Sequence, residues 1–265
     1  GRAMSAEQGV YVELLPEGKI KKDLAGILDE VSFAQAKISD EIFLFSELIF
    51  EPYAAVVDLI RSQARTILMY DDHGGLANMT LFQFMLDTVD DLVSTLEQEN
   101  PLHGTLLRAQ LEDEVPPDDG TAMYPFRASK KILTILVGVM QFQFVVNEVL
   151  HDIQTGESLI SDKYDTLWEV PMRSILRWDG DGLTTQYHFR SAVDYYHFLL
   201  LRFVSCHPAV AWCHCCGRYF IPKTKKKTLY CDRILKDGKT CKEWGPILKH
   251  KQKVSQISVV EEFDR

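Results

Sequence analysis

The chain has 265 residues, of which 46% are hydrophobic and 25% charged, and its formal net charge is −9. These values are typical of a globular protein with one large domain or two, and they exclude wholesale disorder, a collagen-like repeat and a disulfide-rich miniature scaffold. The acidic balance also excludes a protein that is basic along its whole length, as many nucleic-acid-binding chains are.

The charge is divided unequally along the chain. Residues 213–253 hold twelve Lys or Arg and three Asp or Glu, whereas the remainder holds 17 basic and 35 acidic residues. A basic module of +9 is therefore attached to an acidic body of −18. Such asymmetry indicates either that the module binds an external polyanion or that the two parts attract each other.

The first third of the chain predicts one strand and then helices. Residues 10–14 alternate polar and apolar residues like a short strand, and Pro16-Glu17-Gly18 favours a turn. Apolar spacing then predicts three helices, at residues 21–31, 39–50 and 52–70. The sequence Asp-Asp-His-Gly-Gly at residues 71–75 interrupts this pattern.

The middle of the chain predicts two further helices around an acidic loop. Thr80 is expected to cap a helix whose apolar face is formed by Leu81, Met85, Val89, Leu92 and Leu96. Residues 112–120 (EDEVPPDDG) have the composition of a loop. Residues 129–151 predict a central helix. Its most apolar part, residues 132–146, is too short to span a bilayer and is interpreted as buried.

A hairpin and a last helix precede the basic module. Residues 167–178 and 184–189 read as strands, and the Asp-Gly-Asp-Gly sequence at 179–182 is a strong turn signal between them. Ser191 is positioned to cap a helix over residues 192–205, with Asp194 at capping-box spacing. The expected fold class is mainly α (α+β). We expect an acidic helical domain at 4–205, a basic zinc-finger module at 206–254 and a tail at 255–265.

All six cysteines lie after residue 205, which argues against a disulfide framework spread over a secreted protein. Four of them have a zinc-ligand spacing: two residues separate the first pair, fourteen follow, and nine separate the second pair. Four thiolates complete a tetrahedral zinc shell and leave no position for water, which is typical of a structural site. The expected ligands are Cys213, Cys216, Cys231 and Cys241.

Several alternatives remain open at the cysteine cluster. Cys215 and His214 compete with Cys213 as the first ligand, and four reduced thiols in a small core would need no metal. Cys206, on an apolar helix, is expected to be a buried thiol. Thr240 and Glu243 have capping-box spacing around Cys241, and residues 245–246 (Gly-Pro) are expected to break the helix that begins there.

Residues 213–222, 230–233 and 238–243 resemble an uncharacterised family of bacterial proteins that carry a C-terminal four-cysteine zinc finger. They are also similar to the CGNR zinc-finger proteins, in which a mainly helical domain precedes the finger. The resemblance implies zinc as a cofactor and a DNA-binding, regulatory role. The Cys-Gly-Asn-Arg tetrapeptide that defines those proteins is absent, because Cys241 is followed by Lys-Glu-Trp.

Two function hypotheses follow. The first is a nucleic-acid-binding protein, for DNA more than RNA, with an acidic body that senses a signal or a partner. The second is a protein–protein interaction module with a purely structural zinc. We expect no catalytic site, because the residues at 71–73 read as a polar turn and His197 as a core histidine. We also expect no membrane partner and a cytoplasmic location. The expected nucleic-acid contacts are Arg218, Lys223, Lys225, Lys226, Lys227, Arg233, Lys249 and Lys251.

Overall fold

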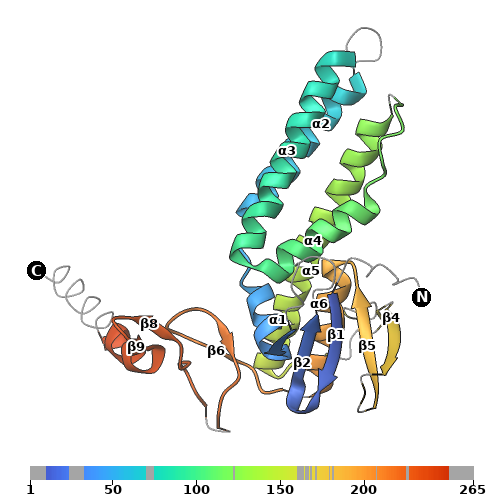
Figure 1. The fold of residues 1–265 in the computed structure, drawn as a ribbon. Helices are drawn as coiled ribbons and strands as arrows, with labels where there is room; N and C mark the ends of the chain where they lie inside the picture. Colours follow the sequence, from blue (N-terminus) through green and yellow to red (C-terminus); the bar gives the residue numbers. More distant parts are fainter. Residues whose placement is uncertain are drawn as a thin grey trace, which may run out of the picture. The chain divides into compact units, whose positions relative to one another are not determined.

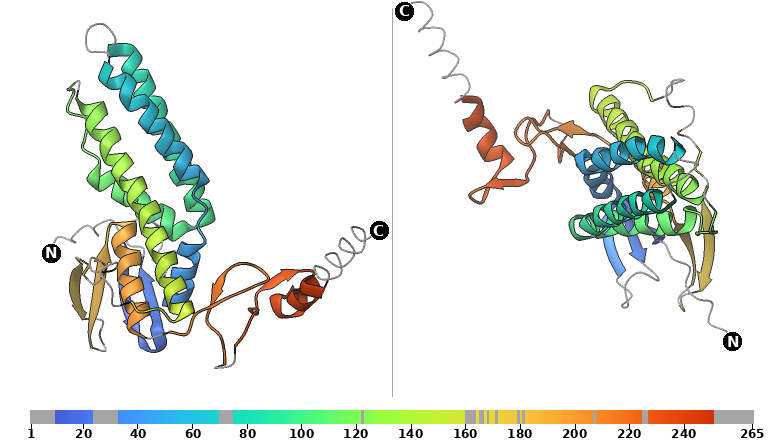
Figure 2. Two further views of the ribbon diagram at one scale, coloured as in Figure 1. Left: turned by 180° about the vertical axis from the view of Figure 1, so that it is seen from behind. Right: turned by 90° about the horizontal axis from the view of Figure 1, so that it is seen from above.

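The structure is a computed structural model, and its fold is mainly α with small sheets, as expected (Figures 1 and 2). The chain forms two compact units, Gly1–Val146 with Asp165–Cys206, and Asn147–Tyr164 with His207–Arg265. The structure describes residues 10–23, 33–69, 75–121, 123–159, 164, 167, 169–170, 172–178, 180, 182–206, 208–224 and 227–250.

The first unit contains a five-stranded antiparallel sheet with the order β3-β2-β1-β5-β4. The predicted hairpin is its β4–β5 pair, and the predicted N-terminal strand is β1. Helix α6 packs on the sheet, because the Phe198 ring lies 4.9 Å from that of Tyr187 and 5.1 Å from that of Phe189. The strands are β1 (Val10–Leu15), β2 (Lys19–Asp23), β3 (Phe33–Lys37), β4 (Arg173–Trp178) and β5 (Leu183–Phe189).

The helix predicted at residues 21–31 is wrong where the structure describes it, because Lys19–Asp23 forms strand β2. The turn at Pro16–Gly18 folds β2 back on β1 and places Ile20 opposite Leu14, where Ile20 is fully buried. The Lys22 amine also lies 2.7 Å from the Glu41 carboxylate in a largely buried ion pair. Long-range burial therefore overrides the local helical pattern here. Residues 24–32 lie outside the described part.

In the part of the chain that the structure describes, six helices lie between residues 38 and 205. Four of them lie close to the predicted positions, and the other two differ from the prediction. Helix α3 begins at Gly75, so that Thr80 lies inside the helix and does not cap it. Helix α4 was not predicted, although Asn100 accepts a hydrogen bond from the His103 N–H at its start. The helices are α1 (Ile38–Ser46), α2 (Glu51–Met69), α3 (Gly75–Glu99), α4 (Pro101–Glu114), α5 (Tyr124–Thr155) and α6 (Ala192–Ser205).

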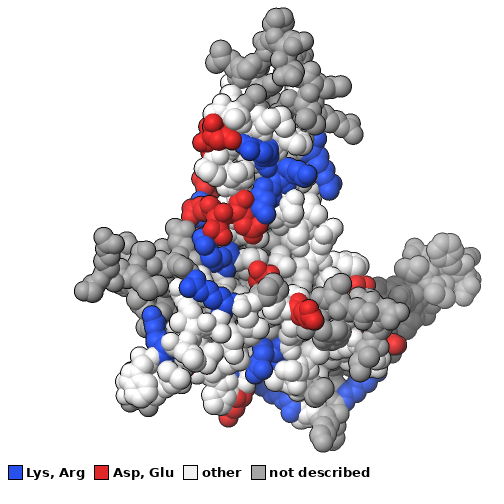
Figure 3. All heavy atoms as spheres, turned by 90° about the vertical axis from the view of Figure 1, so that its right-hand side faces the viewer, with Lys and Arg blue, Asp and Glu red and all other residues white. Residues whose placement is uncertain are grey.

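Helices α3 and α4 are joined by a tight crossing and an ionic clamp. A Cβ on Gly104 would overlap the Glu97 backbone, so glycine lets the two helices approach closely. The Arg108 guanidinium then binds both oxygens of Glu97, at 2.8 and 2.9 Å, and Asp90 at 2.7 Å. On one face of the molecule, Asp and Glu side chains lie next to Lys and Arg side chains (Figure 3).

Helix α5 has 32 residues and is longer than predicted. By length and composition it is long enough and apolar enough to cross a membrane, so the argument that its apolar run is too short is wrong. One such helix is weak evidence for a membrane span, because core helices pass the same test. Gln143 of α5 donates hydrogen bonds to the carbonyls of Phe45 and Leu48, which ties α5 to the end of α1.

Helix α6 has the predicted bounds and the predicted cap, since the Ser191 side chain accepts a hydrogen bond from the Asp194 N–H. Its Tyr196 ring stacks on Phe45 with the centroids 4.0 Å apart, and the Tyr195 hydroxyl donates to Glu41. His197 lies 2.7 Å from the Leu167 carbonyl and is buried, which confirms that it is a core histidine. This aromatic layer is the centre of the first unit.

Candidate metal centre

The first cysteine pair lies in a two-stranded hairpin of the second unit. Strands β6 (Ala211–Trp212) and β7 (Tyr219–Phe220) pair antiparallel, and the Cys213 N–H donates to the Arg218 carbonyl at 3.0 Å. Gly217 has a φ of +64° and donates its N–H to the Cys213 carbonyl at 2.9 Å. That left-handed conformation is inexpensive for glycine, and it closes the turn that holds Cys213 and Cys216 on one side.

A second hairpin places the other pair of cysteines. Strands β8 (Ile234–Lys236) and β9 (Lys239–Thr240) are joined by residues 237–238, both with positive φ. The Cys241 N–H donates to the Arg233 carbonyl at 2.9 Å, which brings Cys241 back toward Cys231. The predicted tight turn across the nine-residue gap is therefore present. The two hairpins are tied together because the His214 N–H donates to the Leu229 carbonyl, also at 2.9 Å.

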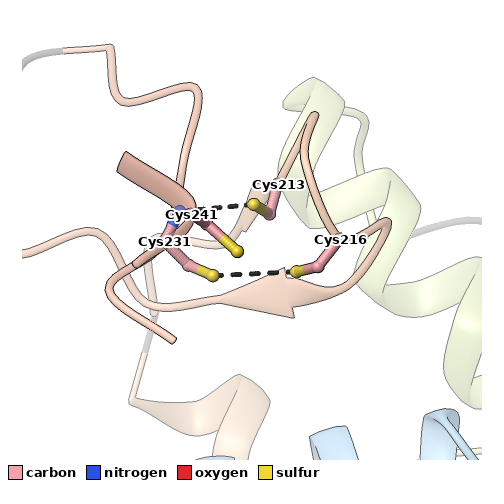
Figure 4. A group of neighbouring side chains, drawn as sticks. All are labelled: Cys213, Cys216, Cys231 and Cys241. Atoms are coloured by element: carbon pink, nitrogen blue, oxygen red, sulfur yellow. Dashed lines mark hydrogen bonds between the residues drawn. The ribbon is translucent and has the colours of Figure 1, made fainter. Parts of the chain in front are cut away.

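The four thiols predicted as zinc ligands converge on one centre (Figure 4). The Sγ atoms of Cys213, Cys216, Cys231 and Cys241 all lie within 4.8 Å of one another. Those of Cys216 and Cys231 are 3.7 Å apart, close to the edge of about 3.8 Å that a tetrahedron with 2.3 Å Zn–S bonds would have. Three of the four are buried and Cys216 is half-buried. The group could hold a metal ion.

Burial and hydrogen bonding act oppositely on the thiols. Burial raises the pKa of Cys213, but backbone N–H groups of Cys231, Cys216 and Cys215 favour its thiolate, and its pKa is lowered to about 7. Burial raises the pKa of both Cys231 and Cys241 by desolvating their thiolates, and the neighbouring Cys231 and Cys216 raise that of Cys241 further. A cation at the centre would remove that penalty, so metal binding should release protons.

The structure places the two competing side chains outside the converging group. Cys215 is half-buried and His214 exposed, and neither belongs to the converging group. The expectation that Cys206 is buried is wrong: it is exposed at the C-cap of α6. Helix α6 ends at Ser205, so the backbone at Cys206 leaves the apolar stripe on which the expectation rested.

The last ligand begins a helix that the structure describes over residues 241–250. Glu243 accepts hydrogen bonds from the N–H and hydroxyl of Thr240, at 2.7 and 2.9 Å, as the capping-box spacing predicts. The expected break at residues 245–246 does not occur. Gly245 instead lies directly against the Tyr230 ring, where a Cβ would overlap the ring carbons. The glycine therefore serves packing and does not end the helix.

The basic residues predicted to contact nucleic acid divide into three groups. Lys223 shares Asp232 with Lys242, at 2.8 and 2.6 Å, and Arg233 donates to the Tyr219 carbonyl at 2.9 Å. Both side chains therefore also bind groups within the cysteine module, although the Lys223 side chain remains 78% exposed. A second group is exposed: Arg218, Lys227 and Lys249. The third lies outside the described residues: Lys225, Lys226 and Lys251.

Sequence reasoning missed two residues that stabilise this centre. Asp232 follows a cysteine ligand and accepts both lysines, and the Trp244 indole N–H donates to the Lys236 carbonyl at 3.0 Å. Lys239 lies over the Trp244 ring, 5.6 Å from its centroid. The only available signal was an acid and a tryptophan inside a lysine-rich stretch, which does not by itself specify partners.

The histidine and carboxylate candidates for catalysis do not form a site in the part of the chain that the structure describes. His103, which had no evident partner in the sequence, is buried with its Nε2 2.5 Å from the Tyr53 hydroxyl. Burial lowers the pKa of His103 to about 4, so it is neutral at physiological pH. The Asp71-Asp72-His73 run lies outside the described residues.

Residues 169–265 match the model of DUF6076, a family of unknown function. The match begins just before β4 and includes β5, α6 and all four converging cysteines. It supports the resemblance to an uncharacterised family, and it shows no link to the CGNR proteins. No curated protein and no solved structure matches the chain.

Proposed function

We propose that the chain is a zinc protein whose basic C-terminal module binds nucleic acid, DNA in preference to RNA, in a regulatory role. The observation that carries the proposal is the convergence of four thiols on one centre in a module dominated by lysines. Zinc fits the donor set because four thiolates are its usual structural shell. The ligands would be Cys213, Cys216, Cys231 and Cys241.

Charge supports the nucleic-acid part of the proposal. Arg218, Lys227 and Lys249 are exposed on the second unit, and the Lys225–Lys227 run stands between the two ligand pairs in the sequence. One zinc centre, with a ligand pair on either side of that run in the sequence, would fix the ends of the loop. Lysine gives point-charge contacts to phosphates more readily than base-edge contacts, so binding should have low sequence specificity. The acidic first unit would then take the signal or partner.

Titration of labelled duplex DNA, single-stranded DNA and RNA against the full chain at several salt concentrations tests this function. Contact with roughly four to six phosphates predicts a log–log slope of about −4 to −5 on duplex DNA. Replacing Lys225, Lys226 and Lys227 by Ala should weaken binding to all sequences alike and make the slope shallower. Lys19→Ala, which removes an exposed cation of the first unit, is the matched control and should change neither.

A specific observation favours a second candidate, a protein-docking module with structural zinc. The second unit exposes large apolar side chains close to its lysines, and single exposed apolar residues are common but a group of them marks interfaces. Absence of binding to all three nucleic acids at low salt, with the metal retained, would leave this candidate. The exposed apolar residues are Ile234, Leu235, Ile247 and Leu248, at 72, 46, 40 and 38%.

A further inference from the structure

Strand β4 is an edge of the five-stranded sheet and pairs with β5 alone among the described strands. It is six residues long, and no register shift interrupts its pairing with β5. An edge strand presents backbone N–H and C=O groups to any chain that can pair with it. Natural edges are usually shortened, bulged or charged to prevent this, and β4 has only its two arginines.

The same strand carries an exposed apolar cluster, which we call the edge patch and define as Leu176, Trp178 and Leu183. Trp178 lies directly opposite Leu183 in the ladder, and Leu176 is two residues from Trp178 and so shares its face. These side chains are 66, 71 and 63% exposed. A contiguous apolar group of this kind beside an unpaired strand edge offers both the main-chain and the side-chain contacts of strand addition.

The charge on β4 indicates which partner fits. Arg173, Ile175 and Arg177 share the other face of β4, and both arginines are exposed. If β4 paired antiparallel with β4 of a second copy and Ile175 lay opposite Ile175, Arg173 of each copy would lie opposite Arg177 of the other. If Leu176 lay opposite Leu176 in such a pair of β4 strands, the Arg177 side chains of the two copies would be diagonal neighbours across the ladder. Like charges so placed are destabilising, which disfavours a second copy.

We propose that β4 binds an extended acidic segment of a partner protein, which adds to the sheet as a sixth strand. Acidic side chains at alternate positions of that segment face Arg173 and Arg177, and the apolar side chains between them cover the edge patch. This surface belongs to the first unit and the cysteine centre to the second, so the proposal stands whether or not the basic module binds nucleic acid.

The test uses the full chain and a fluorescein-labelled peptide of sequence EVDIEVD, titrated by anisotropy. We expect saturable binding, and binding about tenfold weaker for Trp178→Ala and Arg177→Glu, the loss typical of central interface residues. Phe84→Ala removes a similarly exposed ring from α3 and is the matched control. The peptide KVKIKVK, with lysines in place of the acids, should bind at least about tenfold more weakly because it faces the arginines.

Hydrogen exchange on the unaltered chain provides a readout that requires no variant. Addition of EVDIEVD should slow exchange of those amides of residues 173–178 whose N–H groups point away from β5, because strand addition pairs them. Equal peptide affinity in both β4 variants would overturn the proposal, as would binding lost on removal of Lys225–Lys227, which would place the peptide on the basic module. Protection of β4 that increases with protein concentration in the absence of peptide would indicate a second copy and would also overturn the proposal. So would binding to anionic vesicles that depends on Trp178, if the peptide does not bind.

Discussion

At the residue scale, the contact between Gly245 and Tyr230 explains why a glycine occupies the interior of the terminal helix. A methyl group there would overlap the aromatic ring and force the ring or the helix to move. We predict that Gly245→Ala lowers the free energy of unfolding of the second unit by about 1–3 kcal/mol, the usual cost of overpacking. Thermal melts of the zinc-loaded chain measure this loss. Gly138→Ala, on open space in α5, should be neutral or stabilising.

The buried His103 gives the first unit a defined pH dependence. Its pKa is lowered to about 4 by burial, whereas in the unfolded chain it is about 6.5, so between these values the unfolded chain binds the extra proton. Stability is therefore fully present above pH 6.5 and falls toward pH 4, by about 1.4 kcal/mol per pH unit at most. Urea unfolding between pH 4 and 7 measures this slope. His103→Asn should flatten it, and replacement of the exposed His151 by Asn should leave it unchanged.

At the element scale, Arg108 fastens α4 to α3 through Glu97 and Asp90. The side chain is about one-third exposed, so solvent screens part of the interaction. We predict that Arg108→Ala lowers the free energy of unfolding by about 1 kcal/mol. Arg108→Lys should lose part of this free energy, because a lysine ammonium cannot form the bidentate hydrogen bonds that a guanidinium donates to a carboxylate. Arg61→Ala breaks an exposed pair with Asp58 and should cost under about 0.5 kcal/mol. No difference between Arg108→Ala and Arg61→Ala in urea denaturation would contradict the clamp.

Elements with a strong periodic pattern or a local cap could be predicted from the sequence, and elements held by distant contacts could not. The spacing of Met85, Val89 and Leu96 predicted a buried face of α3, and Ser191 predicted the start of α6. Strand β2 was mistaken for a helix because its side chains are held by distant contacts, such as the ion pair of Lys22 with Glu41, 19 residues further along the chain. Helix α4 was missed because most of its residues are buried, so it has little amphipathic contrast.

The cysteine centre was more predictable than the body around it. The convergence of the four cysteines agrees with their spacing. A hairpin with glycine at its turn lies at each pair, and the hydrogen bond from His214 to Leu229 ties the two hairpins together. The partners of the basic side chains did not follow, since Lys223 and Lys242 find Asp232 only after folding. Both lysines stay exposed in these ion pairs, so a partner can still reach them.

At the scale of the whole molecule, the acidic first unit and the basic second unit each carry their own candidate surface. The first offers the edge of β4, and the second a lysine-rich fold around four thiols. The match to DUF6076 covers β4 as well as the cysteines, so both surfaces lie within the stretch that resembles that family. Neither surface requires the other for its chemistry, and variants in one should leave binding at the other unchanged.

The central claim is that Cys213, Cys216, Cys231 and Cys241 hold one zinc ion. Elemental analysis of the full chain, purified without chelator, tests it most directly. We predict one zinc per chain, its loss in Cys231→Ser together with unfolding of the second unit only, and full retention in Cys206→Ala and Cys215→Ala, which remove thiols outside the group. Less than about half an equivalent of zinc in the unaltered chain, or zinc lost in either control, would contradict it.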